Sequence, residues 1–440
     1  MDKQEAGQDI RPDVPKTAIL VGAGQRGHGY SYYAATFPKE LKIVGVCEPR
    51  DYHRDYEATL HRIPPENVFK DWKKAAERDK FADCVFICTP DRLHKGPAIA
   101  FAKKGYHILL EKPMAATEED CKEIVSAVKE NNVILSVCHV MRYMSWVKKV
   151  KEIIDSGEIG EVVNINHTEP VGYYHFAHCF VRGNWHKEED SSFSLLVKCC
   201  HDVDLICYWM SKKCNKVSSF GNLSHFHKTD KPAGSTRRCL DCPDTVQSSC
   251  PYSAKKIYLD MVEKGHKGWP ASVLCDVVDI ENITDALKKG PYGKCVYIND
   301  NDVMSHQVVN MQFEGGATAT LQMVAFTSKI SEREVKIYGT KGEITVRHGA
   351  LPPVRVFNFL TQKSVSHFAQ ESMIVSPLGG NDGADYNTIK AFLKALRNED
   401  QTEIETGPDE TLASHLLCFA AERARIENRV LNRNSKGEFE

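Results

Sequence analysis

The first third of the chain alternates short apolar runs with amphipathic segments. Strand-like runs between Thr17 and Val140 are AILVGA, LKIVGVCE, DCVFICT, HILLEK and VILSVCHV. The intervening segments have helical spacing. One of them ends at Gly105, as a helix C-terminus would, and Thr117 opens a Thr-x-x-Asp capping sequence. Near-continuous apolar strands separated by helices predict a parallel sheet covered on both faces.

After about Ser145 the pattern changes to alternating, β-rich runs. These are GEVVNINHTEP, KVSSFGNLSHF, DVMSHQVVNMQFEGGATATLQMVAF and REVKIYGTKGEITVRHG, and Gly315 and Gly316 supply a hairpin turn in the third. Helical periodicity returns in NDGADYNTIKAFLKALRNED and DETLASHLLCFAAERARIEN. The pattern predicts a second α/β domain whose large, open sheet is mostly antiparallel and carries helices on one face.

The length of 440 residues exceeds what one hydrophobic core usually organises, so two domains are expected. We predict a disordered lead-in over residues 1–15, a parallel-sheet domain over 16–143 and a second domain over 144–430. That second domain contains a cysteine-bearing insertion near 225–260 and is followed by a polar tail over 431–440.

Composition narrows the functional class. With 57 basic and 59 acidic residues the chain has no strong field for nucleic acid or anionic membrane, and we expect neither partner. No apolar run approaches the roughly 18 to 20 residues of a membrane-spanning helix. The N-terminus is acidic and polar, which favours a cytoplasmic location, and most of the 16 cysteines are expected to be reduced, buried thiols.

A glycine-rich turn follows the first predicted strand. Gly22, Gly24 and Gly27 form G-x-G-x-x-G, which gives a tight turn, close approach to a diphosphate and close helix packing. The next strand ends in Glu48, near the offset at which an acid binds the ribose diol. We therefore predict a Rossmann dinucleotide site. Glu48 favours NAD, and nearby Arg50 leaves NADP as an alternative.

Two further strand ends carry polar residues. Thr89 and Pro90 lie at the end of the predicted strand DCVFICT, and Glu111-Lys112-Pro113 lies at the end of HILLEK, at the edge where open α/β sheets bind ligands. At this point the chain resembles the glucose-fructose oxidoreductase, inositol dehydrogenase and MocA family, on VGAGQRG, CTPDRLHKGPAIAFAKKGYHILLEKPMA and IYGTKGEI. The resemblance implies an NAD(P)-dependent oxidoreductase in which Lys112 lies between the nicotinamide and the substrate hydroxyl. The expected cofactor contacts are Gly22, Gly24, Gln25, Arg26, Gly27, Glu48, Thr89, Pro90, His94, Glu111 and Lys112.

The family's second motif, Asp-x-x-x-His, matches SFSLLVKCCHDVDLICYW incompletely. His201 falls on the family histidine, but Val197 replaces the aspartate and Lys198 follows it. We interpret His201 as the general acid/base, with Lys198 one helical turn away holding the substrate oxygen and lowering the His201 pKa. The alternative is a core histidine bonded to Asp202 or Asp204, with Lys198 on the surface.

The preceding segment YYHFAHCFVRGNW combines aromatic faces with polar groups, which suits a sugar or polyol. A polar loop packed on aromatic residues is the alternative. The expected substrate contacts are Lys112, Arg182, Asn184, Trp185, Lys198 and His201.

Cys239, Cys242 and Cys250 have C-x2-C-x7-C spacing. A structural metal, with His225, His227 or Cys275 as fourth ligand, and a redox-labile pair are alternatives to ordinary loop cysteines, which we expect here. We expect no metal in the catalytic chemistry.

The main hypothesis is hydride transfer between NAD(P) and a secondary alcohol of a sugar, polyol or related metabolite. Two alternatives are a redox-neutral, NAD-dependent glycosidase of the same fold and a non-catalytic nucleotide-binding sensor. An open sheet in the second domain favours a homo-oligomer, an argument from fold alone.

Overall fold

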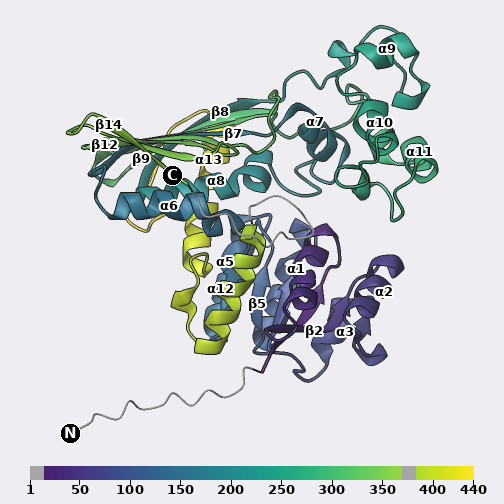
Figure 1. Cartoon of the computed structure of the whole chain (residues 1–440), viewed down its shortest axis with the longest axis horizontal. Coiled ribbons are helices and arrows are strands. Elements are labelled where there is room, and N and C mark those ends of the chain that lie inside the picture. The colour runs from purple at the N-terminus through teal and green to yellow at the C-terminus, as the bar shows by residue number, and fades with distance from the viewer. Residues whose placement is uncertain (1–13, 369–382) are drawn as a thin grey trace.

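The computed structural model describes residues 14–368 and 383–440 of the chain (Figure 1). Its N-terminal sheet has six parallel strands in the order β3-β2-β1-β4-β5-β6. Their bounds are β1 Lys16–Val21, β2 Leu41–Cys47, β3 Val68–Phe69, β4 Cys84–Ile87, β5 His107–Leu110 and β6 Leu135–Val137. The predicted parallel sheet is confirmed. The two-residue edge strand β3 was not predicted from the sequence.

Helices connect these strands and cover the sheet. They are α1 Gln25–Thr36, α2 Asp51–Leu60, α3 Trp72–Glu77, α4 Lys95–Lys103 and α5 Glu118–Glu130. The Thr117 hydroxyl accepts a hydrogen bond from the Asp120 N–H at 3.2 Å, so the predicted N-cap of α5 is confirmed. Gly105 has a φ of 75° just after α4, as expected of a residue that ends a helix.

The second sheet has nine strands in the order β14-β13-β12-β11-β7-β10-β9-β8-β15. Only β10 and β7 pair in parallel, with Ala319 opposite Ile165, so the sheet is mostly antiparallel as predicted. The bounds are β7 Val162–Pro170, β8 Cys214–Asn222, β9 His306–Phe313, β10 Thr318–Val324, β11 Glu334–Gly339, β12 Gly342–Arg347, β13 Val354–Asn358, β14 Lys363–His367 and β15 Leu431–Asn432. Gly315 and Gly316, both at positive φ, make the predicted β9–β10 turn.

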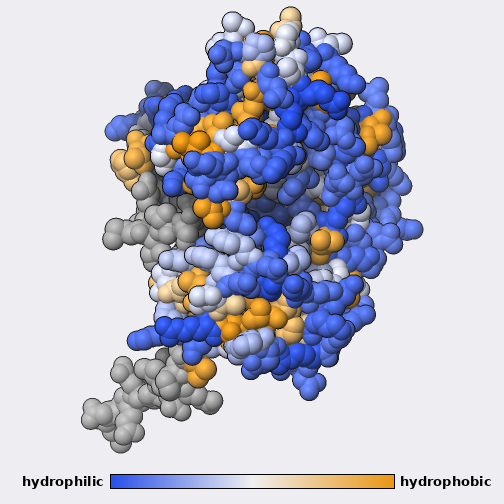
Figure 2. Space-filling model, turned by 90° about the vertical axis from the view of Figure 1, so that its right-hand side faces the viewer, coloured by the Kyte–Doolittle hydropathy of each residue, from blue (hydrophilic) through white to orange (hydrophobic). Residues whose placement is uncertain are grey.

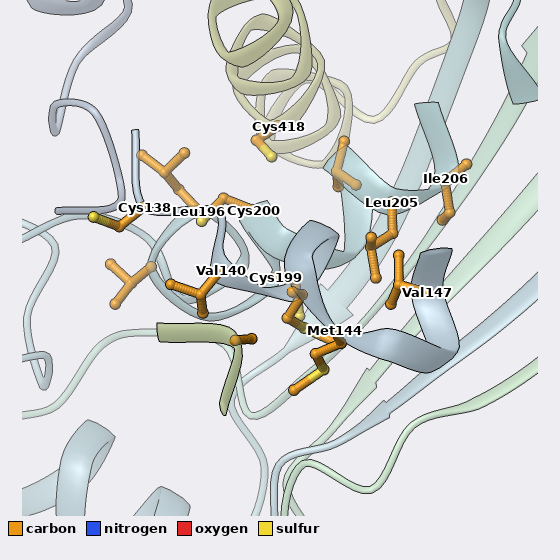
Figure 3. Packing of buried hydrophobic residues seen from close by; sticks show 14 of the residues in the cluster. Cys138, Val140, Met144, Val147, Leu196, Cys199, Cys200, Leu205, Ile206 and Cys418 are labelled. Carbon is orange, nitrogen blue, oxygen red and sulfur yellow. The ribbon is translucent and has the colours of Figure 1, made fainter. Parts of the chain in front are cut away.

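Three helices lie between this sheet and the N-terminal domain in Figure 1: α6 Ser145–Asp155, α8 Ser194–Met210 and α13 Pro408–Glu427. The α12 helix, Ala384–Asn398, packs beside α1, and α13 packs against α5. Figure 3 shows Leu196 and Leu205 of α8 packed with Val140, Met144 and Cys418, all buried in one hydrophobic core. This core places the N-terminal half of α8 next to the carboxyl ends of the parallel strands.

An insertion over residues 223–305 separates β8 from β9 and is longer than the predicted 225–260. It contains α9 Asp244–Ser249, α10 Asp260–Glu263 and α11 Ile280–Lys289, and lies beside α7 Tyr173–Phe176 (Figure 1). The insertion has its own small hydrophobic cluster, separate from the two larger ones.

The C-terminal residues also differ from the expected polar tail. Leu431 is fully buried and pairs with Val217 of β8, and Arg433 bridges to Phe439 in a short return. Strand pairing therefore orders a segment whose composition is polar. Most of the lead-in expected over 1–15 lies outside the described residues. Among the described helices, none combines the length and apolar character needed to cross a bilayer.

Candidate functional site

The glycine turn has the geometry that its three glycines were expected to provide. Gly22 has a φ of 90°, and an added Cβ would lie 2.6 Å from the Cys88 carbonyl oxygen. At Gly27 an added Cβ would lie 2.0 Å from the Gly22 oxygen, so α1 packs too closely for a side chain. Gly24 has only an Arg50 nitrogen near, at 3.6 Å, which leaves its outer face open.

The N-terminus of α1 is free to receive an anion. Gly24 is its N-cap and makes no side-chain cap, the first turn has no acidic residue, and Gln25 at its start is exposed. Unpaired N–H groups and the helix dipole there favour a diphosphate. These features fit the diphosphate of a dinucleotide.

Glu48, at the end of β2, is only 3% exposed. Its carboxylate accepts hydrogen bonds from the Ala23 N–H at 2.8 Å and from Arg50 Nε at 2.8 Å. Burial opposes its ionisation, but the hydrogen bonds from Arg50 and Ala23 lower the Glu48 pKa. The anion is therefore fixed beside the glycine turn, and the half-exposed Arg50 lies over it.

The β4 end presents a buried group without a partner. Thr89 Oγ1 is buried and makes no hydrogen bond with the residues that the structure describes, as expected of a side chain that a cofactor would contact. His94 is fully buried, with Nε2 2.8 Å from the Thr89 carbonyl and Nδ1 2.8 Å from the Pro113 carbonyl. Pro90 begins the turn between them. The His94 side chain therefore links the backbone at the end of β4 to the backbone at the end of β5.

Glu111 is at the centre of a second group of buried, hydrogen-bonded side chains. It accepts hydrogen bonds from Arg26 Nε at 2.7 Å, Tyr30 Oη at 2.8 Å and the Lys112 N–H at 2.6 Å. Arg26 also pairs with Asp385 of α12 at 2.7 Å. Burial alone would raise the Glu111 pKa, but Arg26 and Lys112 lower it. The charged Glu111 thus holds Lys112 at the end of β5.

Lys112 reaches across to α8. Its Nζ donates a hydrogen bond to the Val197 carbonyl oxygen at 2.9 Å. The resemblance aligns Val197 with the family aspartate, and it is the Val197 backbone oxygen that contacts the lysine. The structure thereby brings Lys112 onto the helical turn that leads to His201.

His201 is partly exposed, and its Nδ1 is buried with no hydrogen-bond partner in the described ranges 14–368 and 383–440. Burial lowers the His201 pKa well below its usual value, and Lys112, His139 and Arg333 lower it further. The imidazole is therefore neutral near pH 7. Asp202 and Asp204 do not bond it, which removes the alternative of a core histidine held by either residue.

Those two aspartates have other partners. Asp202 Oδ1 lies 2.7 Å from His167 Nε2 and 2.9 Å from Arg333 Nε, and Asp204 pairs with Arg142 at 2.6 Å. Burial opposes the ionisation of Asp202, but Arg333 and His167 lower its pKa strongly. The network fixes the buried face of α8 against β7 and β11.

Lys198 is buried more deeply than a surface lysine, with its side chain 14% exposed. Its Nζ lies 2.8 Å from Ser331 Oγ and 3.2 Å from Glu169 Oε1. The cations that chiefly depress the His201 pKa are Lys112 and Arg333, and Lys198 is not among them. Lys198 acts instead on His175, whose pKa is lowered well below its usual value by burial and then by Lys198.

His175, on α7, is the main residue that sequence reasoning left out of the predicted site. Lys112 also lowers the His175 pKa, and a hydrogen bond to the Val171 backbone raises it. The signal was present in the YYHF cluster, but nothing local distinguished His175 from its aromatic neighbours. Glu169 was missed because it lies in β7, about 30 residues before the lysine that it neutralises.

The other expected substrate contacts are dispersed. Trp185 Nε1 donates to Asp91 Oδ2 at 2.9 Å, which ties this segment to the N-terminal domain. Asn184 is exposed and makes no hydrogen bond within the described part of the chain. Arg182 is 2% exposed and contacts the insertion through Lys294 and Tyr252 carbonyls, so its guanidinium is engaged there. On the side shown in Figure 2 the surface is recessed between the insertion and the N-terminal domain.

Comparison with known proteins agrees with this architecture. Residues 16–139 match the oxidoreductase family with an NAD-binding Rossmann fold, and residues 151–421 match that family's C-terminal alpha/beta domain. The chain therefore belongs to this family, as its resemblance implied, and its N-terminal domain is of the NAD-binding Rossmann type.

Individual relatives are more distant. A 2,7-anhydro-N-acetylneuraminate hydratase of Escherichia coli is 33% identical over 33% of this chain and 38% of its own length. A levoglucosan dehydrogenase of Pseudarthrobacter phenanthrenivorans is 32% identical over 34% of this chain and 39% of its own. The chain thus spans about two fifths of each of these relatives. A levoglucosan dehydrogenase structure with NADH and levoglucosan has a TM-score of 0.69 at 18% identity, covering 95% of this chain and 99% of that one.

Proposed function

We propose that the protein is an NAD(P)-dependent oxidoreductase that moves hydride between nicotinamide and a secondary alcohol or carbonyl of a sugar, polyol or related metabolite. One observation carries the proposal. The Lys112 ammonium reaches the first turn of α8 at Val197, and its charge depresses the pKa of His201 one turn further on. A cation and a neutral imidazole are thus held together at the carboxyl end of a Rossmann sheet.

The cofactor, when bound, supplies a hydride acceptor or donor. Gly22, Gly24, Gln25 and Gly27 would hold its diphosphate, Glu48 its ribose, and Thr89 and Pro90 its nicotinamide half. Arg26, His94 and Glu111 position these strand ends through the contacts described above. Fit is supported by the open face of Gly24 and the unpartnered Thr89 hydroxyl.

The chain's own groups handle the proton and the charge. Lys112 exchanges its bond to Val197 for one to the substrate oxygen and stabilises negative charge as it develops there. His201, kept neutral by burial and by Lys112, accepts the hydroxyl proton during alcohol oxidation. Lys198, anchored by Glu169, and His175, whose pKa both Lys198 and Lys112 lower, would bind further hydroxyls.

A redox-neutral reaction is the second candidate, and one observation favours it: a relative is named as a hydratase, and adding water involves no net oxidation. The glycosidase alternative has the same property. Both would use the same lysine and histidine, so residue identity does not separate them from a dehydrogenase.

The test follows NADH absorbance and product release in the same wells. The panel contains free sugars, polyols, aryl glycosides, levoglucosan and 2,7-anhydro-N-acetylneuraminate. NADH growth supports the dehydrogenase, and product without NADH supports the redox-neutral reaction. NAD binding with silence in both channels would favour the nucleotide-binding sensor.

Lys112→Met tests the assignment directly. We expect turnover to fall by at least about 10²-fold, as for loss of one oxyanion donor, while NAD affinity is retained. Lys42→Met, at an exposed lysine of β2, is the matched control. Retained turnover in Lys112→Met would remove Lys112 from the mechanism.

A further inference from the structure

The insertion brings four cysteines to one cavity. Cys239, Cys242, Cys250 and Cys295 are all free thiols, and all line a cavity of about 20 Å³. The first three form the C-x2-C-x7-C sequence. The fourth, Cys295, was not foreseen, because 44 residues separate it from Cys250.

Backbone pairing explains how Cys295 arrives there. Arg238 and Lys294 form an antiparallel bridge, and the Cys295 N–H donates to the Arg237 carbonyl at 3.0 Å. Cys239 and Cys242 flank a tight turn in which the Cys242 N–H bonds the Cys239 carbonyl at 3.2 Å. A two-cysteine turn facing cysteines from other segments is the arrangement of structural zinc sites.

A buried, unpaired cation faces the same cavity. Arg182 is 2% exposed, lines the cavity and forms no ion pair within the described residues; its Nη1 is buried without any partner. Its Nη2 lies 3.3 Å from Cys239 Sγ. Burying a guanidinium without a counter-charge is costly. Four thiolates around a divalent cation carry net negative charge, which would compensate Arg182.

The sulfur atoms also have donors suited to thiolates. The Thr236 N–H donates to Cys242 Sγ at 3.4 Å and Arg182 Nη2 donates to Cys239 Sγ at 3.3 Å, whereas the Thr236 hydroxyl donates to the Arg238 carbonyl at 2.6 Å. Outer hydrogen bonds of this kind orient metal ligands. Among the described residues no three such side chains stand in positions that could hold a metal ion, so the site requires the thiol side chains to move from these positions on binding.

We propose that these four cysteines form a tetrahedral structural zinc site. The cavity size favours one ion over a polynuclear cluster, since a single water already needs about 10–15 Å³. The insertion has reason to need it, because only nine buried hydrophobic residues form its own cluster. Small units with so little core are commonly stabilised by a metal.

The ion would also support the substrate side of the molecule. The insertion meets the α7 region through the His178–Tyr258 hydrogen bond of 2.8 Å and the His175–Trp269 ring contact of 5.0 Å. Zinc loss would therefore loosen residues next to His175 without touching the glycine turn. The site is separate from the proposed hydride chemistry and does not depend on it.

The first experiment is elemental analysis of the purified full-length chain, prepared without chelator. We expect about one zinc per chain, released when the thiols are titrated with p-chloromercuribenzoate. Cobalt substitution is expected to give the intense visible bands of tetrahedral thiolate coordination. The proposal would be overturned by folded protein whose zinc content is no higher than background, by iron in place of zinc, or by a disulfide among these cysteines.

Variants locate the ion. Cys242→Ser and Cys295→Ser are expected to lose at least about nine tenths of the zinc, whereas Cys275→Ser is expected to keep it. Cys275 is a half-buried cysteine of the same insertion that does not line the cavity. Loss of zinc in Cys275→Ser with retention in Cys295→Ser would refute the ligand set. The wild-type zinc content stands as a test even where a variant fails to fold.

Discussion

His415 offers a quantitative test of the buried electrostatics behind the site. It lies on α13, is fully buried, and its Nε2 accepts the Met114 N–H at 3.0 Å, two residues beyond Lys112. Burial, with His139 beside it at a ring distance of 5.4 Å, lowers the His415 pKa to about 3. In the unfolded chain the same group titrates near about 6.5.

The sign follows from which state binds the proton. Above about pH 6.5 His415 is neutral in both states and contributes no pH dependence. Below it the unfolded chain gains a proton that the folded chain refuses until about pH 3, so the free energy of unfolding falls on acidification. The slope approaches about 1.4 kcal/mol per pH unit, and the loss reaches about 2.7 kcal/mol at about pH 4.5.

His415→Gln keeps an acceptor for the Met114 N–H but removes the titration. We expect its acid-induced loss of stability to be smaller than that of the wild type by about 2.7 kcal/mol between about pH 8 and about pH 4.5. Urea unfolding followed by the fluorescence of the buried Trp146 and Trp209 measures it, and His266→Gln, at an exposed histidine, is the control. An equal acid loss in His415→Gln and wild type would refute the reasoning.

Three further predictions test other parts of the molecule. Glu48→Gln keeps an acceptor for the Ala23 N–H but removes the negative charge that opposes a 2′-phosphate. The dissociation constant for NADP divided by that for NAD should therefore fall about tenfold or more, and an unchanged ratio in a fluorescence titration would contradict this. Thr117→Ala removes the N-cap hydrogen bond to the Asp120 N–H and should lower the free energy of unfolding, measured with denaturant, by about 1 kcal/mol. An unchanged free energy would mean that the cap does not stabilise the protein. Leu196→Ala, in the packed core of Figure 3, should lower the free energy of unfolding by about 2–5 kcal/mol. A loss below about 1 kcal/mol would mean that neighbouring side chains repack into the cavity.

Local patterns predicted the elements whose residues determine them locally. The five longer parallel strands, the Thr117 cap and the Gly315–Gly316 turn each depend on a few neighbouring residues, and each was found where expected. Two of the strands that were missed depend on partners instead. The β14 strand is largely exposed, so it lacks an apolar face, and β15 pairs with a strand more than 200 residues earlier.

The same distinction applies to the site. The glycine turn and the Glu111-Lys112-Pro113 strand end could be read along the chain because neighbouring residues form them. Helical spacing correctly put Lys198 and His201 on one helix, but it carried no information about Glu169, which comes from β7. The sequence also could not show that Arg182 turns toward the insertion, because its partners lie 57 to 112 residues away.

The replacement of the family aspartate by Val197 changes the balance of charge around the site. A carboxylate there would place a further negative charge beside Lys112 and raise the pKa of His201, whereas the Val197 carbonyl accepts the ammonium's hydrogen bond and adds no charge of its own. Burial and then Lys112 lower the pKa of His201, and burial, Lys198 and, more weakly, Lys112 lower that of His175, so both imidazoles are held neutral. Two neutral bases beside an ammonium are suited to taking a proton from a hydroxyl while the cation holds the oxygen. The loss of the aspartate is thus consistent with retained catalysis, and it argues against reading the substitution as the mark of an inactive sensor.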